Sequence, residues 1–123
     1  MRRFVIAEMS MSPALLPGDR ILARRVRRLR RGQVVFFPHP DRDDFWLVKR
    51  VVGVAGDVVG LENGRPVVQS GSAAAEGAWI VPENHMFVVS DALDLTRADS
   101  RTFGPVPTRP AYVAWLRYRR GQP

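Results

Sequence analysis

The chain has 123 residues, a formal net charge of +7 and no cysteine. This length suits one domain with a core of its own, and the lack of cysteine excludes disulfides, thiolate metal sites and a cysteine nucleophile. The first apolar run, residues 4–7, is too short for a membrane span or a signal-peptide core. The chain as written therefore predicts a cytoplasmic protein, with a domain of a membrane-associated protein as the alternative.

Short β-strands separated by glycine and proline turns account for most of the chain. Asn63-Gly64 suits a type I′ hairpin turn, Pro66 suggests an edge strand, residues 70–77 suggest a flexible loop, and residues 91–107 are rich in turns. The sequence predicts a single mainly β domain over residues 1–123, a curled antiparallel sheet or β-barrel with no long helix. In chain order, the expected strands are residues 20–25, 33–37, 45–54, 58–62, 65–69, 78–81, 85–90 and 111–119.

Much of the positive charge lies in one arginine-rich run, "RRVRRLRR", at residues 24–31. A solvated loop is the simplest interpretation of such a run, and peripheral contact with an anionic membrane is the alternative. The run contains no aromatic residue, and no helix-turn-helix or RNA-binding motif accompanies it. We therefore expect no nucleic-acid partner.

Lys49 is the only lysine, because the other eighteen basic residues are arginines. On a two-faced strand it shares a face with Leu47 and Val51. An apolar neighbourhood lowers the pKa of an amine, so a buried lysine can act as a general base where a guanidinium cannot. A surface lysine kept by chance is the alternative.

A general base needs a nucleophile, and the chain offers serines and threonines. His39 lies between two prolines and His85 follows a turn, so both are expected in loops, outside any metal or triad site. No metal or other cofactor is expected. The serine candidates are Ser10, Ser12, Ser70, Ser72, Ser90 and Ser100.

Four segments resemble, in order, the conserved boxes of the signal peptidase I family of serine proteases (peptidase S26 type). They are "SMSPALLPGD" at 10–19, "GQVVFF" at 32–37, "VKRVVGVAGD" at 48–57 and "VPENHMFVVSDALDLTRADSRTFGPVP" at 81–107. The resemblance implies a serine endopeptidase with a Ser/Lys dyad, in which Ser10 is the nucleophile and Lys49 the general base. It also implies that the partner is a precursor protein, whose N-terminal leader binds in extended form.

The resemblance assigns further residues to the support of the site. It pairs Arg50 with Asp91 and Asp99 with Arg101, although an ordinary surface ion pair would explain the second equally well. Ser90 and Thr96 are both candidates for the hydroxyl that supports the lysine. Met11 would line the substrate groove, and Pro13 would fix the turn after the nucleophile.

The chain departs from the family where many bacterial members place a serine two residues before the nucleophile. Glu8 stands there, and its carboxylate would repel an oxyanion, so we expect it to point elsewhere and the Ser10 backbone N–H to stabilise the oxyanion instead. The short length, the arginine-rich composition and "DSRTFGPVP" resemble the small anchorless members, which include the maturation protease of nickel-type superoxide dismutase. Two alternatives stay open: a regulatory domain like that of self-cleaving bacterial repressors, and an inactive basic binding module.

Overall fold

The structure is a computed structural model that describes residues 1–70 and 77–118. Within them the chain is mainly β, as predicted, with one helical turn. The elements are β1 Arg2–Val5, β2 Arg20–Arg24, β3 Val34–Pro38, β4 Trp46–Val54, β5 Val58–Glu62, β6 Arg65–Val68, β7 Trp79–Ile80, β8 His85–Val89, α1 Ser100–Phe103, β9 Val106–Pro107 and β10 Tyr112–Tyr118.

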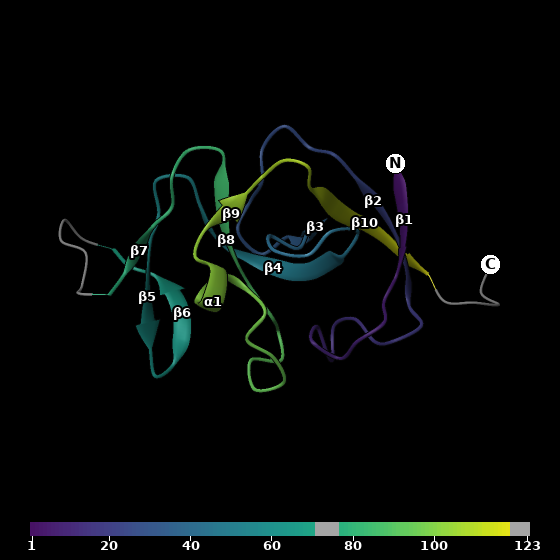
Figure 1. Ribbon diagram of the computed structural model, residues 1–123, viewed down its shortest axis with the longest axis horizontal. Helices are drawn as coiled ribbons and strands as arrows, with labels where there is room; N and C mark the ends of the chain where they lie inside the picture. Colours follow the sequence, from purple (N-terminus) through teal and green to yellow (C-terminus); the bar gives the residue numbers. More distant parts are fainter. Residues whose placement is uncertain (71–76, 119–123) are drawn as a thin grey trace.

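Two antiparallel sheets make up the fold (Figure 1). The larger has seven strands in the order β1-β2-β10-β3-β4-β8-β9, and the smaller has three in the order β6-β5-β7. The last strand of the chain, β10, lies between β2 and β3. The larger sheet is therefore complete only when distant parts of the chain pair. The signal-peptidase-like curled antiparallel fold expected from the sequence is confirmed.

The local turn predictions are confirmed as well. Asn63 and Gly64 both have positive φ, 52° and 78°, as a type I′ turn requires. Pro66 lies in β6, which is an edge strand of the smaller sheet. The expected flexible loop falls mostly on residues 71–76, which lie outside the described residues.

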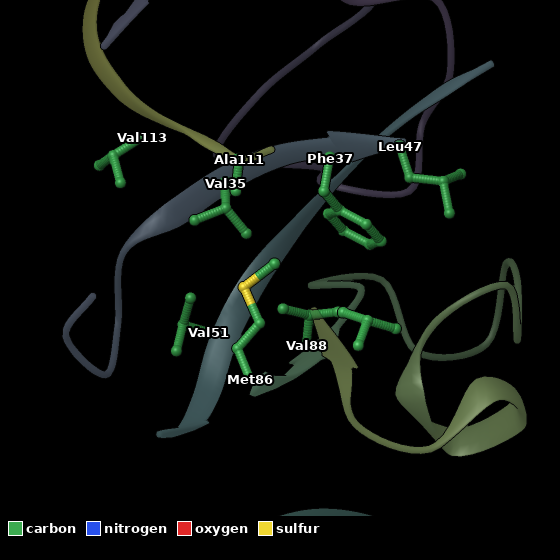
Figure 2. Packing of buried hydrophobic residues seen from close by; sticks show 9 residues of the cluster. Val35, Phe37, Leu47, Val51, Met86, Val88, Ala111 and Val113 are labelled. Atoms are coloured by element: carbon green, nitrogen blue, oxygen red, sulfur yellow. The ribbon is translucent and has the colours of Figure 1, made fainter. Parts of the chain in front are cut away.

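The longest strand, β4, alternates buried and half-buried residues along its whole length. Its buried face carries Leu47, Lys49, Val51 and Gly53, which confirms the predicted position of Lys49 among apolar neighbours. Leu47 and Val51 belong to the largest core cluster, where β3, β4 and β8 contribute side chains that converge in Figure 2. The lysine is therefore carried by a strand that the core holds firmly.

A further cluster joins the two sheets. Val59 of β5 packs with Val81 and with Phe87 of β8. Gly53 lies at this contact, because a methyl group on it would come within 2.8 Å of the Val59 side chain. No helix in the described parts of the chain is long and apolar enough to cross a membrane.

Candidate active site

A cleft of about 300 Å³ lies between the segment that follows β1 and the first half of β4. Ser10 and Lys49 both line it, although only 7% of Ser10 and 2% of Lys49 is exposed. The structure thus brings the two residues of the expected dyad to one cavity. The remaining lining residues are Phe4, Val5, Ile6, Ala7, Glu8, Phe36, Asp44, Phe45, Trp46, Leu47 and Val48.

Backbone hydrogen bonds hold Ser10 in the turn after β1. The N–H of Ala92 donates to the Ser10 carbonyl at 2.9 Å, and the N–H of Ser12 donates to the Met9 carbonyl at 2.9 Å. The first of these ties the turn to the segment after β8. Within residues 1–70 and 77–118, the N–H and the hydroxyl of Ser10 make no hydrogen bond of their own. Both groups therefore remain available to a ligand in the cleft.

Lys49 donates from Nζ to the Ser90 hydroxyl at 2.9 Å. That hydroxyl in turn donates its proton to Asp99 Oδ2 at 3.1 Å, so Ser90 acts only as an acceptor towards the lysine. When Lys49 is neutral, its lone pair is left unused by Ser90. Burial lowers the pKa of Lys49, against the opposing charges of Asp99 and Glu8.

Asp99 is fully buried and anchors this chain of hydrogen bonds. It accepts from the backbone N–H of Ser90 at 3.0 Å and from Arg101 Nη2 at 2.8 Å. Burial alone would raise the pKa of Asp99, but the hydrogen bonds from Arg101 and Ser90 hold it below its ordinary value. The side chains of Arg101 and Asp99 are 5% and 0% exposed, so the interpretation of this pair as an ordinary surface ion pair is wrong.

The other expected ion pair has the same chemistry in a more open place. Arg50 donates from Nε and Nη2 to the two carboxylate oxygens of Asp91, both at 2.7 Å. Arg50 also donates to the Gly32 carbonyl at 2.8 Å. These bonds join β4, the start of β3 and the segment after β8, on the strand face opposite to Lys49.

Other expected site residues lie elsewhere. The Thr96 hydroxyl accepts from the Ala98 N–H at 3.0 Å and does not reach the lysine, so of the two candidate hydroxyls Ser90 is the one in contact with it. Met11 is fully buried in the core with Ile6, and Pro13 is exposed; neither lines the cleft.

His39 lies in a loop, as expected, whereas His85 is the first residue of β8, so the expectation of a loop is wrong for His85. His39 Nδ1 accepts from the Asp41 N–H, and His85 Nδ1 contacts the Glu83 carbonyl. Neither lines the cleft. The described residues contain no group of three or more histidine, cysteine or acidic side chains arranged to hold a metal ion.

Glu8 lines the same cleft as Ser10, and its charge acts on Lys49. Sequence reasoning missed Asp44, which reaches the cleft from the turn before β4. The only sequence signal for Asp44 is its place just before the lysine strand, and that pattern alone does not separate it from Asp43.

Comparison with known proteins points in one direction. A family profile described as signal peptidase, peptidase S26, matches residues 1–76. The chain is 36% identical over 103 residues to mitochondrial ATP-independent inner membrane protease subunit 1b of Arabidopsis thaliana, covering 80% of this chain and 57% of that protein.

Two more relatives agree with this match. Mitochondrial inner membrane protease subunit 1 of Xenopus tropicalis is 31% identical over 102 residues, covering 80% of this chain and 56% of that protein. Signal peptidase I of Buchnera aphidicola is 35% identical over 72 residues, covering 46% of this chain and 23% of that protein. The chain thus spans little more than half the length of the mitochondrial relatives.

Proposed function

Because the chain belongs to the peptidase S26 family of signal peptidases, we propose that it is a serine endopeptidase with Ser10 as nucleophile and Lys49 as general base. Its reaction would remove an N-terminal leader from a precursor protein. The observation that carries the proposal is the buried amine of Lys49, which lines the same cleft as Ser10 and is held in place through Ser90.

The first chemical step follows from the hydrogen-bond directions. The Ser90 hydroxyl donates to Asp99 and accepts a hydrogen bond from the Lys49 amine. The lone pair of the neutral amine is therefore left for the Ser10 hydroxyl proton. Ser10 Oγ attacks the peptide carbonyl as Lys49 accepts that proton. Lys49 then gives the proton to the departing amine. Water, deprotonated by the same lysine, hydrolyses the acyl-enzyme and releases the leader.

The oxyanion formed in this step needs hydrogen-bond donors. The N–H of Ser10 has no partner in the described parts of the chain, so it can donate to the developing charge. Glu8 cannot donate in this way when it is ionised. The Ser10 N–H would therefore stabilise the oxyanion without the help that a serine hydroxyl at position 8 would give.

An extended peptide fits the backbone on both sides of the cleft. β1 is an edge strand, and β4 pairs with β8 only from Arg50 onwards. Residues 46–49 consequently have no strand partner on that side among the described residues. A leader bound between them could form main-chain hydrogen bonds with either edge, and side-chain pockets would then select its sequence.

The test uses the purified protein and a precursor that carries a leader, with the products identified by mass spectrometry. Wild type should cut once, and Ser10→Ala should bind the precursor without cutting it. Ser12→Ala is the matched control, because Ser12 does not line the cleft. Cleavage by Ser10→Ala, or inhibition of wild type by a metal chelator, would contradict the proposal.

The narrower hypothesis, maturation of nickel-type superoxide dismutase, rests on the sequence resemblance alone. The relatives described above are inner membrane protease subunits and a signal peptidase I, and they give it no support. Side-by-side digestion of a nickel superoxide dismutase precursor and a precursor with an ordinary signal peptide separates the two substrate classes. Preference for the second would remove the narrower hypothesis.

A further inference from the structure

The cleft carries charge of the opposite sign to the molecule. The chain has a net charge of +7 and eighteen arginines, yet the ionisable side chains that line the cleft are Glu8, Asp44 and Lys49. In the proposed mechanism Lys49 is neutral when it acts. The lining therefore holds two carboxylates, one amine whose pKa is lowered by burial, and no arginine.

Neither carboxylate has an arginine as an ion-pair partner in the described parts of the chain, although the charge of Glu8 acts on Lys49. Within residues 1–70 and 77–118, Glu8 and Asp44 form no ion pair, whereas Asp57, Asp91 and Asp99 each pair with an arginine. This separates the two cleft carboxylates from the aspartates that have a structural role.

Two arginines come near the cleft without pairing with either carboxylate. Arg2 stacks on Trp46 with its guanidinium carbon 4.4 Å from the ring centroid, and Arg42 stacks on Phe45 at 4.2 Å. Both rings line the cleft, but neither guanidinium does. Arg2 and Arg42 are therefore held on aromatic faces of the lining rather than paired with its carboxylates.

A second observation shows that the cleft is built for a ligand. Ser10 lines the cleft and is only 7% exposed. Its hydroxyl has no hydrogen-bond partner in the described parts of the chain. Glu8 stands two residues before it, and its charge acts on Lys49. Asp44 has φ of 55°, a backbone conformation that aspartate and asparagine tolerate, at the turn before β4. Glu8, Asp44 and Ser10 thus line one cleft.

We infer that the cleft selects peptides that carry a lysine or arginine within a few residues of the bond presented to Ser10, with Glu8 and Asp44 as the specificity-determining residues. The inference rests on the proposed function in placing that bond. The preference runs against the field of the whole molecule, because a chain of net charge +7 attracts acidic peptides to its surface. A preference for basic peptides must then come from the cleft itself.

The experiment uses fluorescence-quenched decapeptides with alanine at the first and third positions before the cut. Lysine, glutamine or glutamate is placed in turn at each remaining position. We measure kcat/KM with wild type and Kd with Ser10→Ala, at low and high salt. At the best position the lysine peptide should exceed the glutamate peptide by roughly five- to tenfold in both measurements, and less at high salt.

Variants then assign the preference to its residues. Glu8→Gln and Asp44→Asn should each lower the lysine-to-glutamate ratio, and the double variant should bring it to about one. Each ratio compares two peptides on the same protein, so effects that are common to both peptides cancel. Asp43→Asn and Glu83→Gln, two exposed acidic residues outside the cleft lining, are matched controls and should leave the ratio unchanged.

The outcomes separate this inference from the proposed function. Equal or better binding of glutamate peptides by wild type and Ser10→Ala would overturn the inference, whether or not the peptides are cut. A ratio that survives in the double variant would overturn it as well. If no peptide is cut but lysine peptides bind more tightly in a way that depends on Glu8 and Asp44, the preference of the cleft for basic peptides stands and the peptidase proposal fails.

Discussion

Two cationic regions of this protein differ in what burial allows them to do. Lys49 is 2% exposed, lies on the core-facing side of β4 and has a lowered pKa because of burial. In the run at residues 24–31, Arg27, Arg28 and Arg30 are exposed and form no ion pair within the described residues. An arginine keeps its charge in either place, whereas a buried lysine can give up its proton. Under the proposed mechanism, this difference accounts for the single lysine of the chain at position 49.

The largest effect is expected from Lys49→Arg, because this variant keeps a positive charge at position 49 but removes the group that can accept a proton. We expect peptide cleavage to fall by a factor of about 10³ or more, in the upper range of general-base effects. The measurement is kcat on a leader peptide, with circular dichroism to establish that the sheet is intact. A variant that keeps a tenth of the wild-type rate would refute the role of Lys49 as base.

Lys49→Met is the companion variant, because it removes the amine and keeps an unbranched chain of similar length. It should be inactive yet unfold at a temperature a few degrees above wild type at neutral pH, since a buried amine is costly to desolvate. Ser90 would lose a donor but keep its bond to Asp99. A lowered unfolding temperature would show that Lys49 stabilises the fold.

The pH dependence of the rate reports the same burial. Because burial lowers the pKa of Lys49 below its ordinary value of 10.5, the rate should rise with pH along one ionisation centred below that value. His39→Gln together with His85→Gln should leave this limb in place, since neither histidine lines the cleft. Loss of the limb in the double histidine variant would assign the base to a histidine.

The sign of the stability effect follows from proton binding. Between the lowered pKa of Lys49 in the folded state and its ordinary value of 10.5, the unfolded chain holds more protons than the folded one. Stability of wild type relative to Lys49→Met should therefore rise with pH across that window. Denaturant titrations of both proteins at several pH values measure this difference, and a constant difference would contradict the lowered pKa.

The ion pairs Arg101–Asp99 and Arg50–Asp91 test the effect of burial in another way, since both join an arginine to an aspartate and only the first is buried. Asp99→Asn leaves Arg101 buried without its carboxylate and should lower the free energy of unfolding by about 3 to 5 kcal/mol. Asp91→Asn affects a pair whose side chains are 33% and 20% exposed, and should cost about 1 kcal/mol. Urea titrations of the two variants give the comparison directly, and equal losses would show that burial does not separate the pairs.

The same two variants differ in their effect on Lys49. The charge of Asp99 raises the pKa of Lys49 and that of Arg101 lowers it. Asp99→Asn should therefore move the rise of the cleavage rate with pH to lower pH. Asp91 lies with Arg50 on the other face of β4 and should leave the limb where it is. A shift of the limb in Asp91→Asn, or none in Asp99→Asn, would argue against the chain of contacts from Asp99 through Ser90 to Lys49.

Much of the fold could be predicted because its signals are local. The alternation of β4 and the Asn63-Gly64 turn each lie within a few residues of sequence. β1, Arg2–Val5, was missed, since it holds only two residues of the apolar run at 4–7 and becomes a strand by pairing with β2. The position of β10 between β2 and β3 is likewise set by contacts between distant segments.

The site was predicted in part for the same reason. The family resemblance pointed to Ser10 and Lys49, which the structure brings to one cleft. The choice between Ser90 and Thr96 depends on which hydroxyl the fold brings to the amine. Met11 is apolar, and sequence pattern does not separate a groove residue from a core residue. The places of Glu8 and Asp44 in the cleft follow from how the turn after β1 meets the start of β4, which no local pattern encodes.

The smallest expected effect on peptide cleavage comes from the arginine run at residues 24–31, which is the exposed member of the comparison with Lys49. We propose that Arg27, Arg28 and Arg30 make peripheral contact with anionic membranes, because their side chains are exposed and without ion pairs in the described parts of the chain. Changing all three to glutamine should weaken binding to vesicles with 30% anionic lipid by about a hundredfold at low salt, since each basic residue near such a surface contributes about 1 kcal/mol.

Turnover of a short neutral peptide by the same triple variant should stay within about twofold of wild type, as none of the three arginines lines the cleft. Arg31→Gln is the control, because Arg31 already pairs with Asp57 and its loss should affect stability more than vesicle binding. Equal losses of peptide turnover and vesicle binding in the triple variant would show that the run supports the active site, and the division between a buried base and a solvated cationic surface would then be wrong.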